Sequence, residues 1–266
     1  MPIGKGDSMM YLEKLFGLKG KVAVVTGGGQ GIGQTVALGL AQAGADLVIV
    51  CRHGADETIR KIEEVGGKAY YVSCDVTDEA QVKAAVAEII GKSGHIDILF
   101  NNAGICYHKD AYEATVEEWR RVIDVNLTGE YIMAREVART MIDGKIKGSI
   151  INMASMSGTI VNIPQRQAAY NASKAGVMHM TKSLAIEWAD YGIRVNSLSP
   201  GYVATPMSID PKFVDQELMD AWMPLMPLHR MAKPEELVPA VLYLASPAAG
   251  YTTGSDIIVD GAYSIV

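Results

Sequence analysis

The sequence has few cysteines, and none of them sits in a pattern that predicts a disulfide or a metal site. Its 266 residues contain Cys51, Cys74 and Cys106, which form no C-x-x-C motif. The five histidines show no metal-ligand spacing with them. We therefore expect no metal, and reduced thiols in a cytoplasmic protein.

Long apolar runs and an excess of positive charge are also absent. No uninterrupted apolar stretch is long enough to span a bilayer, and the opening MPIGKGDSMMYLEKL has neither an apolar h-region nor a small-residue cleavage site. The net charge of -6 and the pI near 5.4, without a basic stripe, argue against nucleic acid or an anionic membrane as partner. We expect residues 1–17 to form a loose N-terminal arm.

The sequence does contain a regular alternation of short apolar runs and helical patterns. With 49% hydrophobic residues the chain can bury a large core, so we expect residues 18–266 to form a single α/β domain. The alternation predicts a doubly wound, Rossmann-type parallel sheet with helices on both faces and an active site at the carboxyl ends of its strands. Strands are expected within residues 21–26, 46–51, 69–75, 95–104, 148–155, 192–201 and 256–261, and the main helices within 31–43, 55–65, 79–92, 116–141, 168–190 and 234–245.

The stretch SMSGTIVNIPQRQAAYNASK, residues 155–174, is predicted to carry the chemistry. Tyr170 and Lys174 are four residues apart in a helical pattern, so their side chains share one face. A phenol is a poor acid or base at neutral pH, but a neighbouring ammonium group lowers its pKa. Ser155 ends an apolar run typical of a strand, where its hydroxyl is placed to hydrogen-bond a substrate oxygen. These three residues predict a proton-transfer site, although the Tyr/Lys spacing alone is also that of an ordinary surface pair.

A glycine cluster between an expected strand and helix predicts a dinucleotide site. The literal G-x-G-x-x-G pattern is absent, and the glycines fall as Gly27-x-x-x-Gly31-x-Gly33. Glycines let the backbone turn sharply and approach a pyrophosphate, which the free N–H groups of a helix start stabilise. A plain glycine-rich turn is the alternative.

The end of the run DLVIVC distinguishes the two nicotinamide dinucleotides. An acidic residue there would bind the ribose 2′-hydroxyl, whereas an arginine accommodates a 2′-phosphate. Cys51 stands at about the acidic position and is followed by Arg52 and His53. The sequence therefore favours NADP(H), with NAD(H) as the alternative if Arg52 is an ordinary surface residue.

These motifs, in this order, resemble the classical short-chain dehydrogenase/reductase family. The resemblance runs from about Gly20 to Gly261, and it is carried by Thr26 with the glycine turn, Asn101-Asn102-Ala103-Gly104, Asn126, Ser155, Tyr170 and Lys174. It implies an NAD(P)-dependent oxidoreductase acting on CH–OH groups. The cofactor contacts that it implies are Gly27, Gln30, Gly31, Ile32, Gly33, Arg52, Asp75, Val76, Asn102, Ala103, Gly104, Tyr170, Lys174, Pro200, Gly201, Val203 and Thr205.

The resemblance also implies the catalytic roles. Tyr170 exchanges the proton, Lys174 lowers its pKa and binds the nicotinamide ribose, and Ser155 positions the substrate oxygen. Asn126 kinks its helix and holds a water linked to Lys174. Asn is a poor residue in the middle of a helix, and its apolar neighbours make a solvent-facing role unattractive. Asp75 could equally belong to the N-cap region of the next helix, and both roles can hold at once.

The substrate is expected to be a polyol or a ketose. Neutral donors and acceptors surround the expected site, and of these we single out Gln165 and His108 as substrate contacts beside Ser155 and Tyr170. The runs NIPQRQAAYNASK and SPGYVATPM resemble mannitol dehydrogenases and sorbose reductases. A sugar-acid dehydrogenase of the gluconate or deoxygluconate type, with Arg166 meeting a carboxylate, is an alternative, as are a 3-oxoacyl reductase and a dinucleotide-binding regulatory protein without catalysis.

Two further expectations concern the lid and the assembly. The segment at about 205–227 keeps poorly to one period and is interpreted as a partly helical substrate lid, with core filling as the alternative role of its methionines. The resemblance implies a homotetramer built through helices 116–141 and 168–190, whose apolar faces would equally suit packing on the sheet.

Overall fold

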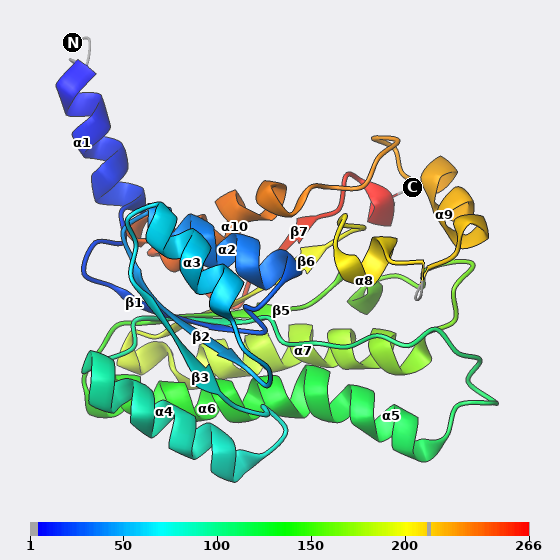
Figure 1. Cartoon of the computed structure of the whole chain (residues 1–266), viewed down its shortest axis with the longest axis horizontal. Helices are drawn as coiled ribbons and strands as arrows, with labels where there is room; N and C mark the ends of the chain where they lie inside the picture. Colours follow the sequence, from blue (N-terminus) through cyan, green and yellow to red (C-terminus); the bar gives the residue numbers. More distant parts are fainter. Residues whose placement is uncertain (1–4, 212–213, 266) are drawn as a thin grey trace.

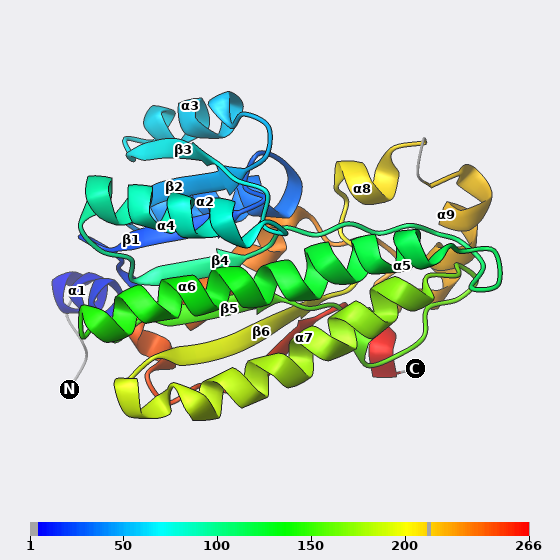
Figure 2. The same cartoon turned by 90° about the horizontal axis from the view of Figure 1, so that it is seen from below.

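The computed structural model describes residues 5–211 and 214–265, which form a seven-stranded parallel sheet with helices on both faces (Figures 1 and 2). The strand order is β3-β2-β1-β4-β5-β6-β7. The chain adds strands outward from β1 to β3 on one side, and then returns to the centre and adds β4 to β7 on the other side. This confirms the predicted doubly wound fold, in which the expected ligand crevice is the point at the carboxyl ends of β1 and β4 where the strand order reverses. The strands are β1 Val22–Thr26, β2 Asp46–Cys51, β3 Ala69–Ser73, β4 Ile98–Asn101, β5 Ser149–Met153, β6 Arg194–Pro200 and β7 Asp256–Val259.

The two faces of the sheet bury two separate apolar clusters. Because side chains alternate along a strand, Val24 of β1 packs in one cluster and Val25 in the other. Both faces are covered, which explains why the central strands are apolar without interruption. Helices α2 Gly31–Gln42, α3 Asp56–Glu64 and α10 Val238–Ala245 lie on one side of the sheet, and α4 Glu79–Ser93, α5 Val116–Ile123, α6 Gly129–Asp143 and α7 Ala168–Glu187 lie on the other, as Figure 1 shows.

Two of the expected helices are interrupted. The helix predicted over 116–141 consists of α5 and α6 joined by a π-helical turn at Asp124–Thr128, with Asn126 at its centre. A π turn shifts the register of the backbone hydrogen bonds, which the apolar period of the sequence does not show. The helix predicted over 234–245 begins as a 3₁₀ turn, Pro234–Leu237, before α10.

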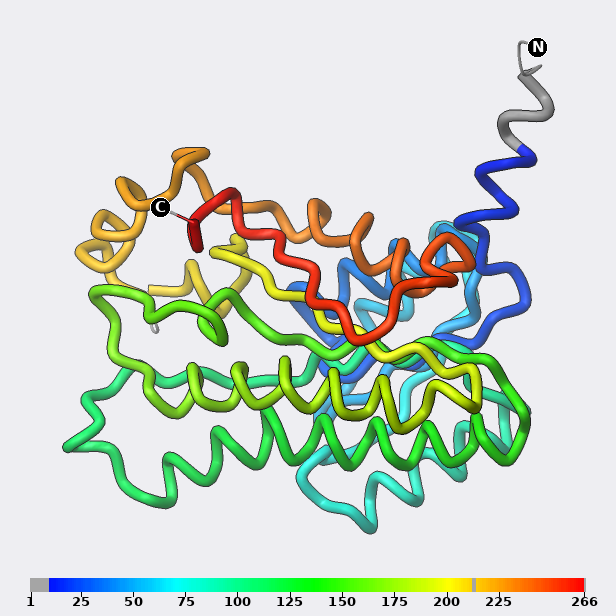
Figure 3. The backbone as a smooth tube through the Cα atoms, turned by 180° about the vertical axis from the view of Figure 1, so that it is seen from behind, coloured from blue at the N-terminus to red at the C-terminus, as the bar shows by residue number. Residues whose placement is uncertain are grey.

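The segment expected as an N-terminal arm contains helix α1, Lys5–Phe16. This helix points away from the rest of the molecule (Figures 1 and 3). None of the helices within the described residues is long and apolar enough to cross a membrane.

The expected lid contains two short helices beyond the carboxyl ends of the strands. These are α8, Pro206–Ile209, and α9, Gln216–Trp222 (Figure 1). Residues 212 and 213, which the expected lid includes, lie outside the described residues. A third apolar cluster packs the segment onto the domain through Met156, Val214, Trp222, Met226 and Tyr263.

Candidate active site

Tyr170, Lys174 and Ser155 lie together where β5 gives way to α7. Ser155 follows β5 by two residues in an extended conformation, and its side-chain oxygen accepts the Ser157 N–H at 3.1 Å. The Ser155 hydroxyl hydrogen-bonds to Tyr170, which lies in the first turn of α7. Lys174 follows one turn later, with its Nζ 5.9 Å from the centroid of the Tyr170 ring. The structure therefore brings the predicted group together.

Lys174 is a buried cation with two partners on the chain. Only 2% of its surface is exposed. Its Nζ donates to the carbonyl of Met153, at the end of β5, and to Oε1 of Glu130 on α6 at 3.2 Å. Glu130 is equally buried and was not among the predicted site residues. The signal in the sequence was an acidic residue within the apolar pattern of residues 129–138, four positions after Asn126.

The pKa of Tyr170 differs from the expectation. Burial raises it well above its ordinary value, the Cys106 thiol and the Glu130 carboxyl raise it further, and the hydrogen bond with Ser155 lowers it. We expected Lys174 to lower this pKa. In the structure the Lys174 ammonium lies against Glu130, and when this carboxyl is ionised its negative charge offsets the field of the cation at the phenol.

Asn126 clamps the loop after β4 against the catalytic helix. Its Oδ1 accepts the Ile105 N–H at 2.8 Å, and its Nδ2 donates to the Ile105 carbonyl at 2.9 Å and to the Ser173 hydroxyl at 3.2 Å. Both N–H groups of the carboxamide and one acceptor position of its oxygen are thus engaged. A side chain on Gly104 would place its Cβ 3.4 Å from Asn126 Oδ1 and 3.8 Å from Lys174 Nζ, so this loop passes directly over the lysine.

The glycine turn forms a narrow cradle at the crevice. Gly27 and Gly31 have φ angles of 64° and 56°, which favour glycine. A Cβ on Gly33 would lie 2.5 Å from both Asn102 Nδ2 and the Gly27 carbonyl oxygen. Thr205, far away in sequence, contacts the same turn, because its Cβ lies 3.7 Å from a Cβ built on Gly31.

The start of α2 is suited to a bound anion. Its N-cap residue, Gln30, makes no side-chain cap hydrogen bond, and its first turn, which includes Ile32, has no acidic residue. The first N–H groups of a helix have no partner within the helix, and the helix dipole favours negative charge there. Together with the close approach that the glycines allow, this fits the pyrophosphate of a dinucleotide.

Asn102 and Ala103 fix the wall beside the cradle. Their backbone N–H groups donate to the Thr26 hydroxyl at 2.9 and 3.0 Å. The Asn102 amide nitrogen donates in turn to the carbonyls of Thr26 and Gly27, at 3.1 and 3.2 Å. The ends of β1 and β4 are therefore tied together by side chains directly at the crevice.

The end of β2 carries a cation and no acid. The Cys51 thiol donates within its own loop to the carbonyls of His53 and Gly54, and the exposed Arg52 side chain lies 4.0 Å from Asp75 Oδ2. Burial raises the pKa of Asp75, but the hydrogen bonds from Thr77 and the charge of Arg52 together lower it by more, so the net shift is downward. The N-cap of α4 is Asp78, and Asp75 lies three residues earlier, in the turn that leads into the helix, where its carboxylate accepts the Thr77 N–H at 3.0 Å.

The remaining predicted cofactor contacts lie in the turn after β6 and in the loop that follows β3. Pro200 ends β6, and Val203 bridges to Ala232. A Cβ on Gly201 would lie 2.7 Å from the Asp260 backbone, so this turn packs tightly on the segment after β7. Val76 is buried against Gly129 of α6.

The predicted substrate contacts are largely engaged with one another and with the lid. Gln165 Nε2 donates to the Tyr202 hydroxyl at 2.7 Å, and its Oε1 accepts the Trp222 indole N–H at 2.8 Å. His108 meets Trp222 edge to face, with the ring centroids 6.3 Å apart. The aromatic pair Tyr202 and Trp222, stacked at 4.4 Å, was not predicted.

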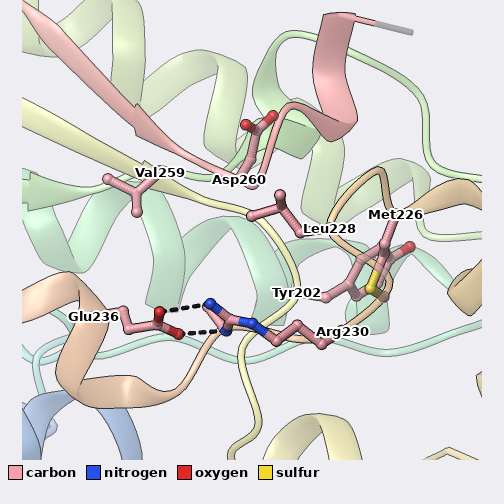
Figure 4. A pocket seen from close by; sticks show the side chains of 9 residues that line it. Tyr202, Met226, Leu228, Arg230, Glu236, Val259 and Asp260 are labelled. Atoms are coloured by element: carbon pink, nitrogen blue, oxygen red, sulfur yellow. Dashed lines mark hydrogen bonds and ion pairs between the residues drawn. The ribbon is translucent and has the colours of Figure 1, made fainter.

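A cavity of about 100 Å³ lies under the C-terminal segment (Figure 4). Arg230 and Glu236 form a two-pronged ion pair across it, at 2.6 and 2.7 Å, so its charges are satisfied internally. None of its lining residues belongs to the proton-transfer group, and we do not assign the chemistry to it. Among the described residues, no group of three or more His, Cys, Asp or Glu side chains is arranged to hold a metal ion.

Comparisons with known proteins agree with this geometry. A family model described as enoyl-(acyl carrier protein) reductase matches residues 27–264. The chain is 48% identical over 255 residues to a sorbose reductase of Candida albicans, covering 94% of this chain and 89% of that protein. It is 43% identical over 260 residues to an NADP-dependent mannitol dehydrogenase of Alternaria alternata, covering 96% of each. The solved structure of a short-chain type dehydrogenase/reductase from Mycobacterium marinum is 44% identical, with a TM-score of 0.90, and covers 95% of this chain and 99% of that one.

Proposed function

The chain belongs to the short-chain dehydrogenase/reductase family, and from this premise we propose that it is an NADP(H)-dependent oxidoreductase that interconverts a secondary alcohol and a ketone of a polyol or ketose. The observation that carries the proposal is the placement of Ser155, Tyr170 and Lys174 together beyond the end of β5, in a sheet whose crevice also holds the glycine cradle. The named activities of the sorbose reductase and the mannitol dehydrogenase support the substrate class.

The proposed mechanism gives each side chain a separate task. Ser155 donates to the substrate oxygen and orients it toward Tyr170, whose hydroxyl gives the proton in reduction and whose phenolate takes it in oxidation. Lys174 supplies the cation behind the phenol. Because the carboxamide of Asn126 is engaged, we assign the water of the proton relay to its backbone carbonyl in the π turn. The bound nicotinamide supplies or accepts the hydride.

The sugar-acid alternative depends on a free cation for the substrate carboxylate. Arg166, the candidate, forms an ion pair with Asp110 and is exposed at the surface. A substrate carboxylate would have to compete with Asp110 for this guanidinium, which favours a neutral substrate. The regulatory alternative does not explain why Ser155 and Lys174, both buried, lie together with the half-buried Tyr170.

Absorbance at the reduced-nicotinamide band tests the function. We would supply NADPH and NADH in parallel with fructose, sorbose and keto-gluconates, and then run the reverse reaction with polyols. Turnover of a neutral ketose with NADPH supports the proposal. A strict requirement for a sugar acid would move the enzyme to the alternative, and dinucleotide binding without turnover on the whole panel would indicate a regulatory protein.

The cofactor preference is tested by Arg52→Ala. Removing a guanidinium that meets a 2′-phosphate costs a charge-assisted hydrogen bond, so we expect NADPH to bind about tenfold or more weakly while NADH binding changes little. Fluorescence titration of both dinucleotides measures this. The matched control is Arg60→Ala, an exposed arginine on α3 that pairs with Glu64. Equal loss for both dinucleotides would show that Arg52 does not read the 2′-phosphate.

We also propose that the segment at about 205–227 is a substrate lid, that the protein forms a homotetramer and that it is cytoplasmic. The lid proposal is supported by α9, whose Trp222 donates to Gln165. The homotetramer proposal is supported by apolar side chains exposed on the helices expected at its interface, Tyr131 on α6 and Ile186 on α7. The cytoplasmic proposal is supported by the three unpaired thiols.

A further inference from the structure

Glu130 is the buried group that the proposed mechanism leaves without a role. Its surface is 2% exposed, its Oε1 accepts from Lys174 Nζ at 3.2 Å, and its Oε2 is buried without any hydrogen-bond partner. A buried carboxylate with an unsatisfied oxygen is costly, so a purely structural glutamate would be a poor choice here. The position of Glu130 beside the catalytic lysine therefore calls for a functional explanation.

The titratable groups that face Glu130 belong to the active site. Lys174 and Tyr170 face it from α7, and Cys106, in the loop after β4, acts on Tyr170 from the same region. The other neighbours are uncharged: Asn101 of β4 donates to the Glu130 backbone carbonyl at 2.9 Å, and the backbone of Met153 in β5 contacts the carboxyl. The charge state of Glu130 therefore acts on Lys174 and Tyr170.

The pKa of the Glu130 carboxyl lies far above its ordinary value. Burial raises its pKa to about 8, although Lys174 and the Met153 backbone both pull it down. A protonated Glu130 leaves the Lys174 charge free to stabilise a phenolate at Tyr170. An ionised Glu130 neutralises that charge and, as an anion of its own, makes the phenolate harder to form.

We propose that Glu130 is a positioning residue of the proton-transfer site, which holds the Lys174 ammonium and sets, through its own proton, how much of that positive charge reaches Tyr170. This rests on the proposed function. When Glu130 loses its proton to solvent, Tyr170 keeps its own proton more firmly, so the phenolate that oxidation needs forms only at higher pH. The residue thus sets the pH range in which each direction of the reaction is catalysed.

Glu130→Gln tests the proposal because the amide keeps the size and an acceptor for Lys174 but cannot ionise. We expect the acid limb of the kcat/KM profile for oxidation and the alkaline limb for reduction to move together to lower pH by about one unit, the order expected when one nearby charge is removed from a partly shielded site. The matched control is Glu136→Gln, on the same helix, 8% exposed and paired with Arg135 and Arg139. It should leave both limbs in place.

A readout independent of turnover uses the wild-type protein. Its infrared difference spectrum should contain a carboxylic-acid C=O band that disappears as the pH rises through about 8, is missing in Glu130→Gln and persists in Glu136→Gln. Unmoved pH limbs in an active, folded Glu130→Gln enzyme, or the absence of that band, would overturn the proposal. Failure of the proposed function is a different result, namely a wild-type protein that turns over nothing while the band is still present.

Discussion

Tyr170→Phe should reduce turnover by about a thousandfold or more, while the binding of NADPH stays within a few-fold of the wild-type value. General acid–base catalysis contributes about 10²–10⁴-fold, and Ser155 cannot replace the phenol, since it is itself an ordinary hydroxyl. The phenylalanine ring keeps the packing of the tyrosine beside Lys174 and loses only the hydroxyl that contacts Ser155. Steady-state kinetics with a fluorescence titration of NADPH measures both quantities.

Tyr112→Phe is the matched control for this change, because Tyr112 is 82% exposed and should lose nothing. The assignment is contradicted in two ways. A folded Tyr170→Phe protein that no longer binds NADPH would make Tyr170 a binding residue, and one that keeps most of its turnover would move the proton to another group.

The sequence predicted those parts of the fold and the site that depend on local patterns. The apolar runs located every strand because both faces of the sheet are covered. The four-residue spacing of Tyr170 and Lys174 placed them on one helix face, and the glycine spacing marked the cradle that the close approaches at Gly33 now explain. In each case the information lies within one segment of the chain.

What the sequence did not predict depends on contacts between distant segments. Glu130 meets Lys174 across 44 residues, and Gln165 meets Trp222 across 57, so neither pair has a local signature. The pairing with Glu130 also changes the expected effect of Lys174 on Tyr170. Gln165, which stays a predicted substrate contact, also bonds to Tyr202, 37 residues away, and this partner has no local signature either.

Gly33→Ala should damage both the stability of the protein and its affinity for NADPH. Alanine favours a helix by about 1 kcal/mol over glycine, but its Cβ would lie 2.5 Å from the Gly27 carbonyl oxygen and from Asn102 Nδ2. The carbonyl is backbone and cannot rotate away, and moving Asn102 breaks its hydrogen bonds to Thr26 and Gly27. Overpacking of this kind costs about 1–3 kcal/mol, so the clash outweighs the helix preference.

The same displacement opens the turn that would hold the pyrophosphate, so we expect NADPH to bind at least about tenfold more weakly, or about 1.4 kcal/mol. Gly91→Ala is the matched control, because Gly91 lies within α4 and a Cβ there meets nothing within 4 Å. It should raise the free energy of unfolding slightly and leave NADPH binding unchanged. Chemical denaturation and a binding titration of both variants decide the matter. If Gly33→Ala is as stable as Gly91→Ala and binds NADPH normally, α2 does not pack on the glycine turn as closely as the structure shows, and the cradle is not the pyrophosphate site.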